Sequence, residues 1–145
     1  MKSPRILNIG CGNSFYGTDR IDLYESPSTT KVCNIEEKLP FKDNSFDEIY
    51  CKSVLEHIKN LGLFVEECFR VLKYGGKIWI RTDFAGYLPT HLFKSHEHNR
   101  LLDVQYSVKG QAYGHEQNED AHYHLFVESH LRKLFKKFKN HKISN

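Results

Sequence analysis

The first half of the chain alternates short apolar runs with polar loops. Five runs of strand type are expected, at residues 5–9, 20–23, 31–34, 46–51 and 77–82. Before the last run, apolar side chains recur at spacings of three and four residues, which predicts a helix over residues 61–73 packed on a sheet. Gly75-Gly76 is expected to end that helix. Strands that alternate with helical segments predict an α/β fold with a mostly parallel sheet covered on both faces.

The first connection of this sheet is too short for a helix. A parallel crossover normally needs a dozen residues or more. Ten residues separate Ile9 from Arg20, and they include the glycines Gly12 and Gly17. We therefore expect a turn or loop in place of the first helix.

The second half of the chain is less regular. Residues 83–126 are interrupted by glycine and proline, are rich in histidine, and show no core-forming period. A helix is expected over residues 127–139, with an apolar stripe and a lysine-rich opposite face. Residues 141–143 could begin a sixth strand. An unfilled sheet edge would favour pairing with a second copy of the chain.

Composition narrows the class of protein. The chain has 145 residues, of which 39% are hydrophobic and 27% charged, as expected for one globular domain. No apolar run is long enough to span a membrane, and none resembles a signal peptide. The net charge of +3 gives little support to nucleic-acid binding. Four cysteines without a C-x-x-C pair indicate reduced thiols and a cytoplasmic protein.

The motif Gly10-Cys11-Gly12 directly follows the first apolar run. Glycines at the carboxyl end of a parallel strand allow close approach of a nucleotide-like ligand. Further along come Asp22-Leu23, then Leu39-Pro40-Phe41, the run from Asn44 to Tyr50, the run from Val54 to Ile58, and Gly75-Gly76. In this order and spacing, residues 5–84 resemble the class I S-adenosylmethionine-dependent methyltransferases, in particular their small methyltransferase-11-like branch.

The resemblance implies a three-layer Rossmann-like methyltransferase fold, here with a shortened first crossover and without its last strand. It implies one domain over residues 1–145, with a cofactor-binding half at 1–84, a lid or acceptor segment at 85–126, and a terminal helix with an edge strand at 127–145. It also implies an enzyme that transfers a methyl group from S-adenosylmethionine to an acceptor that the sequence does not identify.

The resemblance assigns cofactor contacts to ten residues. These are Asn8, Gly10, Cys11, Gly12, Asp22, Leu23, Asn34, Ile35, Lys52 and Ser53. Asp22 would accept hydrogen bonds from both ribose hydroxyls, with Asp19 as the competing carboxylate. Asn34 would bind the adenine amino group, and Asn8 stands where many relatives carry an acidic residue.

Three histidines are candidates for handling the acceptor: His57, His122 and His124. The pairs His96-x-His98 and His122-x-His124 could alternatively chelate a metal. No cysteine accompanies them and their spacing matches no standard finger, so no metal is assigned. A further alternative is a protein that binds the cofactor without catalysis, or a subunit that depends on a partner.

Overall fold

The computed structural model describes residues 3–82, 126 and 128–138. The chain forms two compact units. The first comprises residues 1–55 and 60–81, and the second residues 56–59 and 82–145. The first unit extends over nearly the same residues as the cofactor-binding half expected from the sequence.

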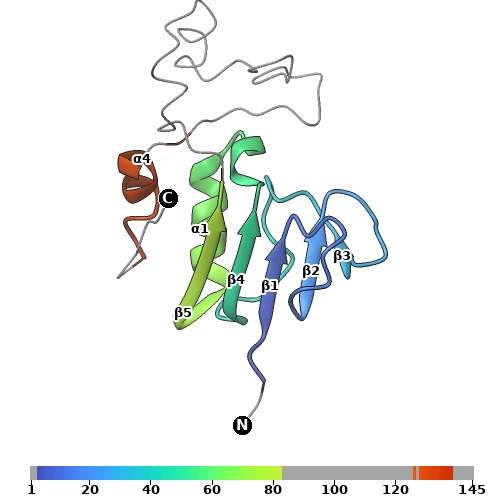
Figure 1. Cartoon of the computed structure of the whole chain (residues 1–145). Coiled ribbons are helices and arrows are strands. Elements are labelled where there is room, and N and C mark those ends of the chain that lie inside the picture. The colour runs from blue at the N-terminus through green and yellow to red at the C-terminus, as the bar shows by residue number, and fades with distance from the viewer. Residues whose placement is uncertain (1–2, 83–125, 127, 139–145) are drawn as a thin grey trace, which may run out of the picture. The chain divides into compact units, whose positions relative to one another are not determined.

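The first unit is built on a five-stranded parallel sheet in the order β3-β2-β1-β4-β5. The strands are β1 (Ile6–Ile9), β2 (Asp19–Asp22), β3 (Lys31–Val32), β4 (Phe46–Lys52) and β5 (Leu72–Arg81). The arrows of β1, β2, β4 and β5 point the same way in Figure 1, and parallel pairing with β2 gives β3 the same direction. The predicted α/β class and parallel sheet are confirmed.

One face of the sheet carries the core. Register places Leu7 beside Ile49, and Ile9 between Ile21 and Cys51, and all five side chains are fully buried. Alternation along each strand points them to the same face.

Helix α1 (Leu61–Val71) belongs to the same unit and follows β4 in the chain. The Asn60 side chain caps it by accepting a hydrogen bond from the Leu63 N–H at 3.1 Å. Its buried residues include Phe64, Val65 and Cys68, the members of the predicted apolar stripe. Figure 1 shows the helix alongside β4 and β5.

The prediction that Gly75-Gly76 ends the helix is wrong. The helix ends at Val71, and Leu72 is already extended. Phe46 of β4 pairs with Leu72 of β5, and Glu48 pairs with Lys77. One residue of β4 therefore lies opposite four residues of β5, which bulge out of the ladder. Gly75 has φ +77°, and a Cβ on Gly76 would lie 2.8 Å from the Leu72 side chain. The glycine pair therefore forms this bulge.

A charged cluster ties helix α1 to the loop before β4. The Glu67 carboxylate is buried and accepts the Leu39 N–H at 2.7 Å and two N–H groups of Arg70 at 2.8 and 2.6 Å. Arg70 also donates to the carbonyls of Leu39 and Phe41 and to the Asp43 carboxylate. The hydrogen bonds from Arg70 are the main cause that lowers the pKa of Glu67.

No helix fills either of the first two crossovers, as predicted for the first. Residues 10–18 fold over the sheet instead: Tyr16 stacks edge-on against Tyr50 with ring centroids 5.0 Å apart, and its hydroxyl donates to Glu48 at 2.7 Å. Arg20 joins the two helix-free loops by donating to the carbonyls of Gly17 at 2.8 Å and Ser28 at 2.5 Å. Side-chain contacts thus replace the packing that crossover helices would supply.

In the second unit, the structure describes helix α4 (Glu128–Leu134) and the short 3₁₀ segment η1 (Leu55–His57), which begins in the first unit. Phe135 is buried and Phe138 half-buried, whereas Lys133, Lys136 and Lys137 are exposed. The helix predicted over residues 127–139 is shorter than expected, because residues 135–138 form a turn and a bend, but apolar and lysine side chains differ in burial as predicted. Within the described residues, no helix combines the length and apolar character needed to cross a membrane.

Candidate functional site

The carboxyl edge of the sheet gathers most of the residues that the sequence assigned to a cofactor. Ile9 pairs with Ile21 and Cys51, so the loop beginning at Gly10 lies beside the ends of β2 and β4. The Gly10 and Cys11 N–H groups both donate to the Ile21 carbonyl, at 2.9 and 3.1 Å. On the other side, the Cys33 N–H donates to the Asp22 carbonyl at 2.9 Å.

The two glycines of the motif have different physical roles. Gly10 has φ +66°, and a Cβ there would lie 2.1 Å from Val54 Cγ2, so its small size makes room for Val54. Gly12 has φ +52°, and a Cβ there would meet nothing within 4 Å. Gly12 is therefore the glycine that faces open space, where a ligand could approach. Val54 was not singled out from the sequence, because only its contact with Gly10 reveals its role.

Asp22 holds the glycine loop in place. Its Oδ2 accepts the Gly12 N–H at 2.8 Å, and its Oδ1 accepts the Tyr24 N–H at 3.2 Å. A carboxylate offers about four acceptor sites, so one on each oxygen remains available. Two neighbouring acceptors on one rigid carboxylate suit the two hydroxyls of a ribose. The contribution of Tyr24 is made by its backbone, which no side-chain motif would reveal.

Asp19, the competing carboxylate, lies at the opposite end of β2. It accepts two hydrogen bonds from the Arg5 guanidinium, at 3.0 and 2.8 Å. These hydrogen bonds are the main cause that lowers the pKa of Asp19. Asp19 is thus committed to an ion pair away from the glycine loop, and Asp22 is the better ribose candidate.

Asn34 and Ile35 follow β3; Asn34 is exposed and Ile35 is half-buried. The Asn34 Oδ1 accepts the Glu36 N–H at 3.0 Å, and its Nδ2 donates to Glu37 at 3.3 Å. The side chain therefore shapes its own turn. An amide oxygen has two lone pairs, so the Asn34 oxygen can accept a second hydrogen bond. Its contact with an adenine amino group stays a prediction.

Lys52 and Ser53 end β4 and are exposed at the same edge. Ser53 has φ +53°, an uncommon conformation for a residue other than glycine. Its N–H donates to the Arg81 carbonyl at 2.8 Å, which holds the bend against β5. Strained backbone of this kind is often found at functional sites.

Asn8, Cys11 and Leu23 complete the predicted set. Asn8 is 2% exposed, and its amide donates to the Tyr16 carbonyl at 3.1 Å, which anchors the helix-free crossover. Cys11 is buried and Leu23 is exposed. Their contacts with a cofactor stay predictions.

All four cysteines are described and none forms a disulfide, as predicted. Burial raises the pKa of the Cys33 thiol and raises that of Cys68 well above its ordinary value.

The predicted acceptor residues cannot be placed around this edge. His57 belongs to the second unit, where it ends η1 and is half-buried. His122 and His124 lie outside the described residues, as do His96 and His98 and the expected lid segment. Within the described ranges, no three His, Cys, Asp or Glu side chains are grouped as metal ligands would be.

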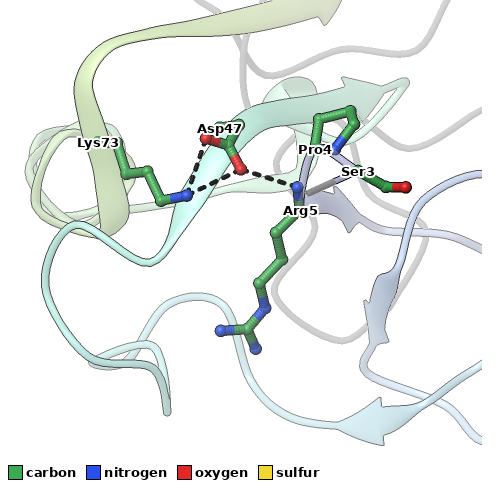
Figure 2. Close-up of a pocket in the computed structure, with 5 residues that line it drawn as sticks. All are labelled: Ser3, Pro4, Arg5, Asp47 and Lys73. Carbon is green, nitrogen blue, oxygen red and sulfur yellow. Dashed lines mark hydrogen bonds and ion pairs between the residues drawn. The ribbon is translucent and has the colours of Figure 1, made fainter. Parts of the chain in front are cut away.

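A hollow lies at the amino end of the sheet, away from the glycine loop. It is lined by Ser3, Pro4, Arg5, Asp47 and Lys73. Figure 2 shows the Asp47 carboxylate between Lys73 Nζ, at 2.8 and 2.9 Å, and the Arg5 backbone nitrogen, at 2.8 Å. The carboxylate is already paired, and its pKa is lowered chiefly by the hydrogen bond from Lys73. The groups in this hollow satisfy one another, which fits a structural role.

Parts of the chain are similar to known methyltransferases. Residues 13–80 match the family described as "Methyltransferase domain". The mitochondrial ubiquinone biosynthesis O-methyltransferase of Rattus norvegicus is 40% identical over 52 residues, which are 36% of this chain and 15% of that protein. The sterol 24-C-methyltransferase of Schizosaccharomyces pombe is 27% identical and is matched over 60% of this chain and 31% of its own length.

Solved structures share the fold. A possible histamine N-methyltransferase from Thermotoga maritima has a TM-score of 0.65 at 16% identity, and the match covers 94% of this chain and 64% of that chain. An S-adenosylmethionine-dependent methyltransferase from Methanosarcina mazei has a TM-score of 0.64 at 19% identity, covering 94% and 79%.

Residues 13–80 thus match the methyltransferase domain family, and the sheet has the Rossmann-like fold of solved S-adenosylmethionine-dependent methyltransferases, as the motifs predicted. The chain spans only a small part of the curated relatives it matches, 15% of the rat protein.

Proposed function

We propose that this protein binds S-adenosylmethionine at the carboxyl edge of its sheet and transfers the methyl group to an acceptor. The observation that carries the proposal is the pairing of Asp22 with Gly12. A carboxylate with one available acceptor site on each oxygen stands beside a glycine that faces open space. The match of residues 13–80 to the methyltransferase domain family and the parallel sheet order support the same cofactor.

The residues present fit this cofactor by their chemistry. Asp22 would accept the ribose hydroxyls, while the Gly12 position leaves room for the ligand to approach the backbone. The exposed bend at Lys52 and Ser53 would line the methionine part. Asn8 offers a neutral amide and is committed to Tyr16, so attraction of the methionine ammonium would come from elsewhere.

The chemistry demands little of the protein beyond positioning. When bound, the cofactor supplies a methyl group on a positively charged sulfur, which is displaced in one step by an acceptor lone pair and leaves S-adenosylhomocysteine. The chain would hold donor and acceptor in line, since orientation alone removes much of such a barrier. Where the acceptor carries a proton, we propose His57, His122 or His124 as the base that removes it.

Binding without catalysis is the second candidate function. The distribution of candidate residues favours it. The described residues of the first unit include the candidate cofactor contacts, but none of the histidines proposed to handle the acceptor. In that case the protein would bind the cofactor as a regulator or as a subunit of a larger enzyme.

Calorimetry with S-adenosylhomocysteine tests the cofactor, and radiolabelled methyl transfer tests the reaction. We expect saturable binding that Asp22→Ala weakens and Asp19→Asn does not. Incubation with methyl-labelled S-adenosylmethionine and size-fractionated cell extract should then label one fraction. Binding without any labelled fraction would select the non-catalytic candidate, and absence of binding would contradict both.

We also propose a cytoplasmic location. Four free thiols fit a reducing compartment. Fractionation of cells that express the full chain tests this: recovery with an organelle fraction would contradict it.

A further inference from the structure

The loop that joins β2 to β3 directs a cluster of hydroxyl groups at the glycine motif. Ser26 Oγ lies 2.7 Å and Ser28 Oγ 2.6 Å from the Gly12 carbonyl oxygen. Ser26 Oγ also lies 2.8 Å from Thr29 Oγ1, which in turn is 3.7 Å from Cys11 Sγ. We call Ser26, Ser28 and Thr29 the hydroxyl cluster.

One arrangement of protons satisfies the cluster. Each hydroxyl donates a single proton, and a carbonyl oxygen accepts two. Ser26 and Ser28 can therefore both donate to the Gly12 carbonyl, and the single Thr29 proton is shared between Ser26 Oγ at 2.8 Å and the Tyr24 carbonyl at 3.2 Å. The Ser28 N–H also donates to Ser26 Oγ, at 3.3 Å. The Gly12 carbonyl thus accepts two short hydrogen bonds from side chains of another loop, beside a longer one from Cys11 Sγ at 3.7 Å.

Gly12 is consequently held at both of its polar groups. Its N–H donates to Asp22 at the end of β2, and its carbonyl accepts from the hydroxyl cluster. Neither neighbouring crossover contains a helix that could fix this peptide. Glycine is the residue with most conformational freedom to lose, so these bonds determine its orientation.

Ser28 is the buried member of the cluster, and its backbone is held by a hydrogen bond. It is 1% exposed, and its own carbonyl accepts the Arg20 Nε at 2.5 Å. Arg20 is anchored in β2 and also donates to Gly17 of the first crossover. The Ser28 hydroxyl therefore projects from a fixed backbone onto a glycine that would otherwise be mobile.

We propose that Ser28, assisted by Ser26, is a positioning residue for cofactor binding. It fixes the Gly12 peptide so that the Gly12 N–H meets Asp22 and leaves the outer acceptor sites of that carboxylate turned toward a ribose. This inference rests on the proposed function, because it assumes that Asp22 receives an adenosyl ligand. Ser28 acts through Gly12 and Asp22 and contacts no ligand itself.

The test compares adenosine with 2′-deoxyadenosine as probes, by calorimetry on the full chain. Asp22 should make the wild-type protein prefer adenosine, and Ser28→Ala should reduce that preference about fivefold, the scale of one lost neutral hydrogen bond. A variant that merely destabilises the fold would weaken both probes equally and leave their ratio unchanged. Hydrogen exchange of the Gly12 amide in ligand-free protein, followed by NMR, should accelerate by a similar factor.

Thr30→Val is the matched control. The Thr30 hydroxyl lies in the same loop but bonds only the backbone of Arg20, at 2.7 and 2.9 Å. This variant should leave the adenosine preference and the Gly12 exchange as in the wild type. If Ser28→Ala does not fold, Ser26→Ala carries the same test, since its hydroxyl reaches the same carbonyl.

The outcomes separate the two proposals. If the wild-type protein binds neither probe nor S-adenosylhomocysteine, the proposed function fails, and Gly12 exchange alone decides whether Ser28 positions the loop. If the wild type binds, an unchanged preference in Ser28→Ala overturns the inference.

Discussion

Replacing Asp22 should weaken cofactor binding more than any other single change at the carboxyl edge. Its carboxylate makes two structural hydrogen bonds, to the N–H groups of Gly12 and Tyr24, and keeps one acceptor site per oxygen for a ligand. Hydrogen bonds to a charged group contribute about 1.5–3 kcal/mol. Asp22→Ala should therefore weaken S-adenosylhomocysteine binding roughly 10- to 150-fold.

The structure separates the two causes of that loss. Asp22→Ala frees the glycine loop as well as removing the ribose acceptor, whereas Asp22→Asn keeps one oxygen that can still bond the loop. We expect Asp22→Asn to fall between wild type and Asp22→Ala in affinity measured by calorimetry. Thermal unfolding without ligand reports the loop contribution, and the fold should survive in both variants.

Asp19→Asn is the control at the other end of β2. It removes the negative charge that pairs with Arg5, so it should lower the stability of the fold. The affinity for S-adenosylhomocysteine should not change, because Asp19 lies away from the glycine loop. Unchanged affinity in Asp22→Ala would refute the assignment of the ribose contact. A loss confined to Asp19→Asn would move the ligand to the amino end of the sheet.

Three further predictions concern stability. Gly10→Ala should destabilise the fold by roughly 2–5 kcal/mol in denaturant titration, because its Cβ would overlap Val54 and its φ is positive. Gly12→Ala should cost only about 1–2 kcal/mol, and Val54→Ala should rescue much of the Gly10→Ala loss; equal costs for the two alanines would contradict the contact. Arg70→Ala should cost about 2–4 kcal/mol, because it leaves the Glu67 carboxylate buried and unpaired, and a cost under 1 kcal/mol would show the pair to behave like a surface one. The lowered pKa of Glu67 adds stability that is present above its ordinary value of 4.5 and lost as the pH falls through the folded value, so Glu67→Gln should flatten acid unfolding in that range; an identical acid profile in the variant would contradict this.

The strands could be read from the sequence because each ends in a polar or glycine residue after an apolar run. The edge strand β3 was predicted over four residues but has two, since edge strands lack a second neighbour to extend them. Gly75-Gly76 misled because two adjacent glycines suit a bulge as well as a helix end. Only the pairing of Leu72 with Phe46 distinguishes them.

The candidate site was predicted only in outline. Gly12 and Asp22 could be singled out because glycine and carboxylate at strand ends are suited to ligand contact, whereas the small size of Gly10 makes room for Val54. The contacts that shape the edge join residues far apart in the sequence, so the sequence alone does not show them. Val54, after β4, packs on Gly10, after β1, and Ser28 of the next crossover donates to the Gly12 carbonyl. A hydroxyl-rich stretch such as residues 26–30 resembles any solvated loop until its partner is known.

The most direct test of the account is the place where the cofactor binds. In an amide NMR titration of the full chain with S-adenosylhomocysteine, the N–H signals of Gly12, Tyr24 and Ser53 should shift in a saturable manner. Those of Arg5 and Asp47, at the hollow of the amino end, should stay unchanged. No saturable shift, or shifts confined to Arg5 and Asp47, would contradict a cofactor site at the carboxyl edge.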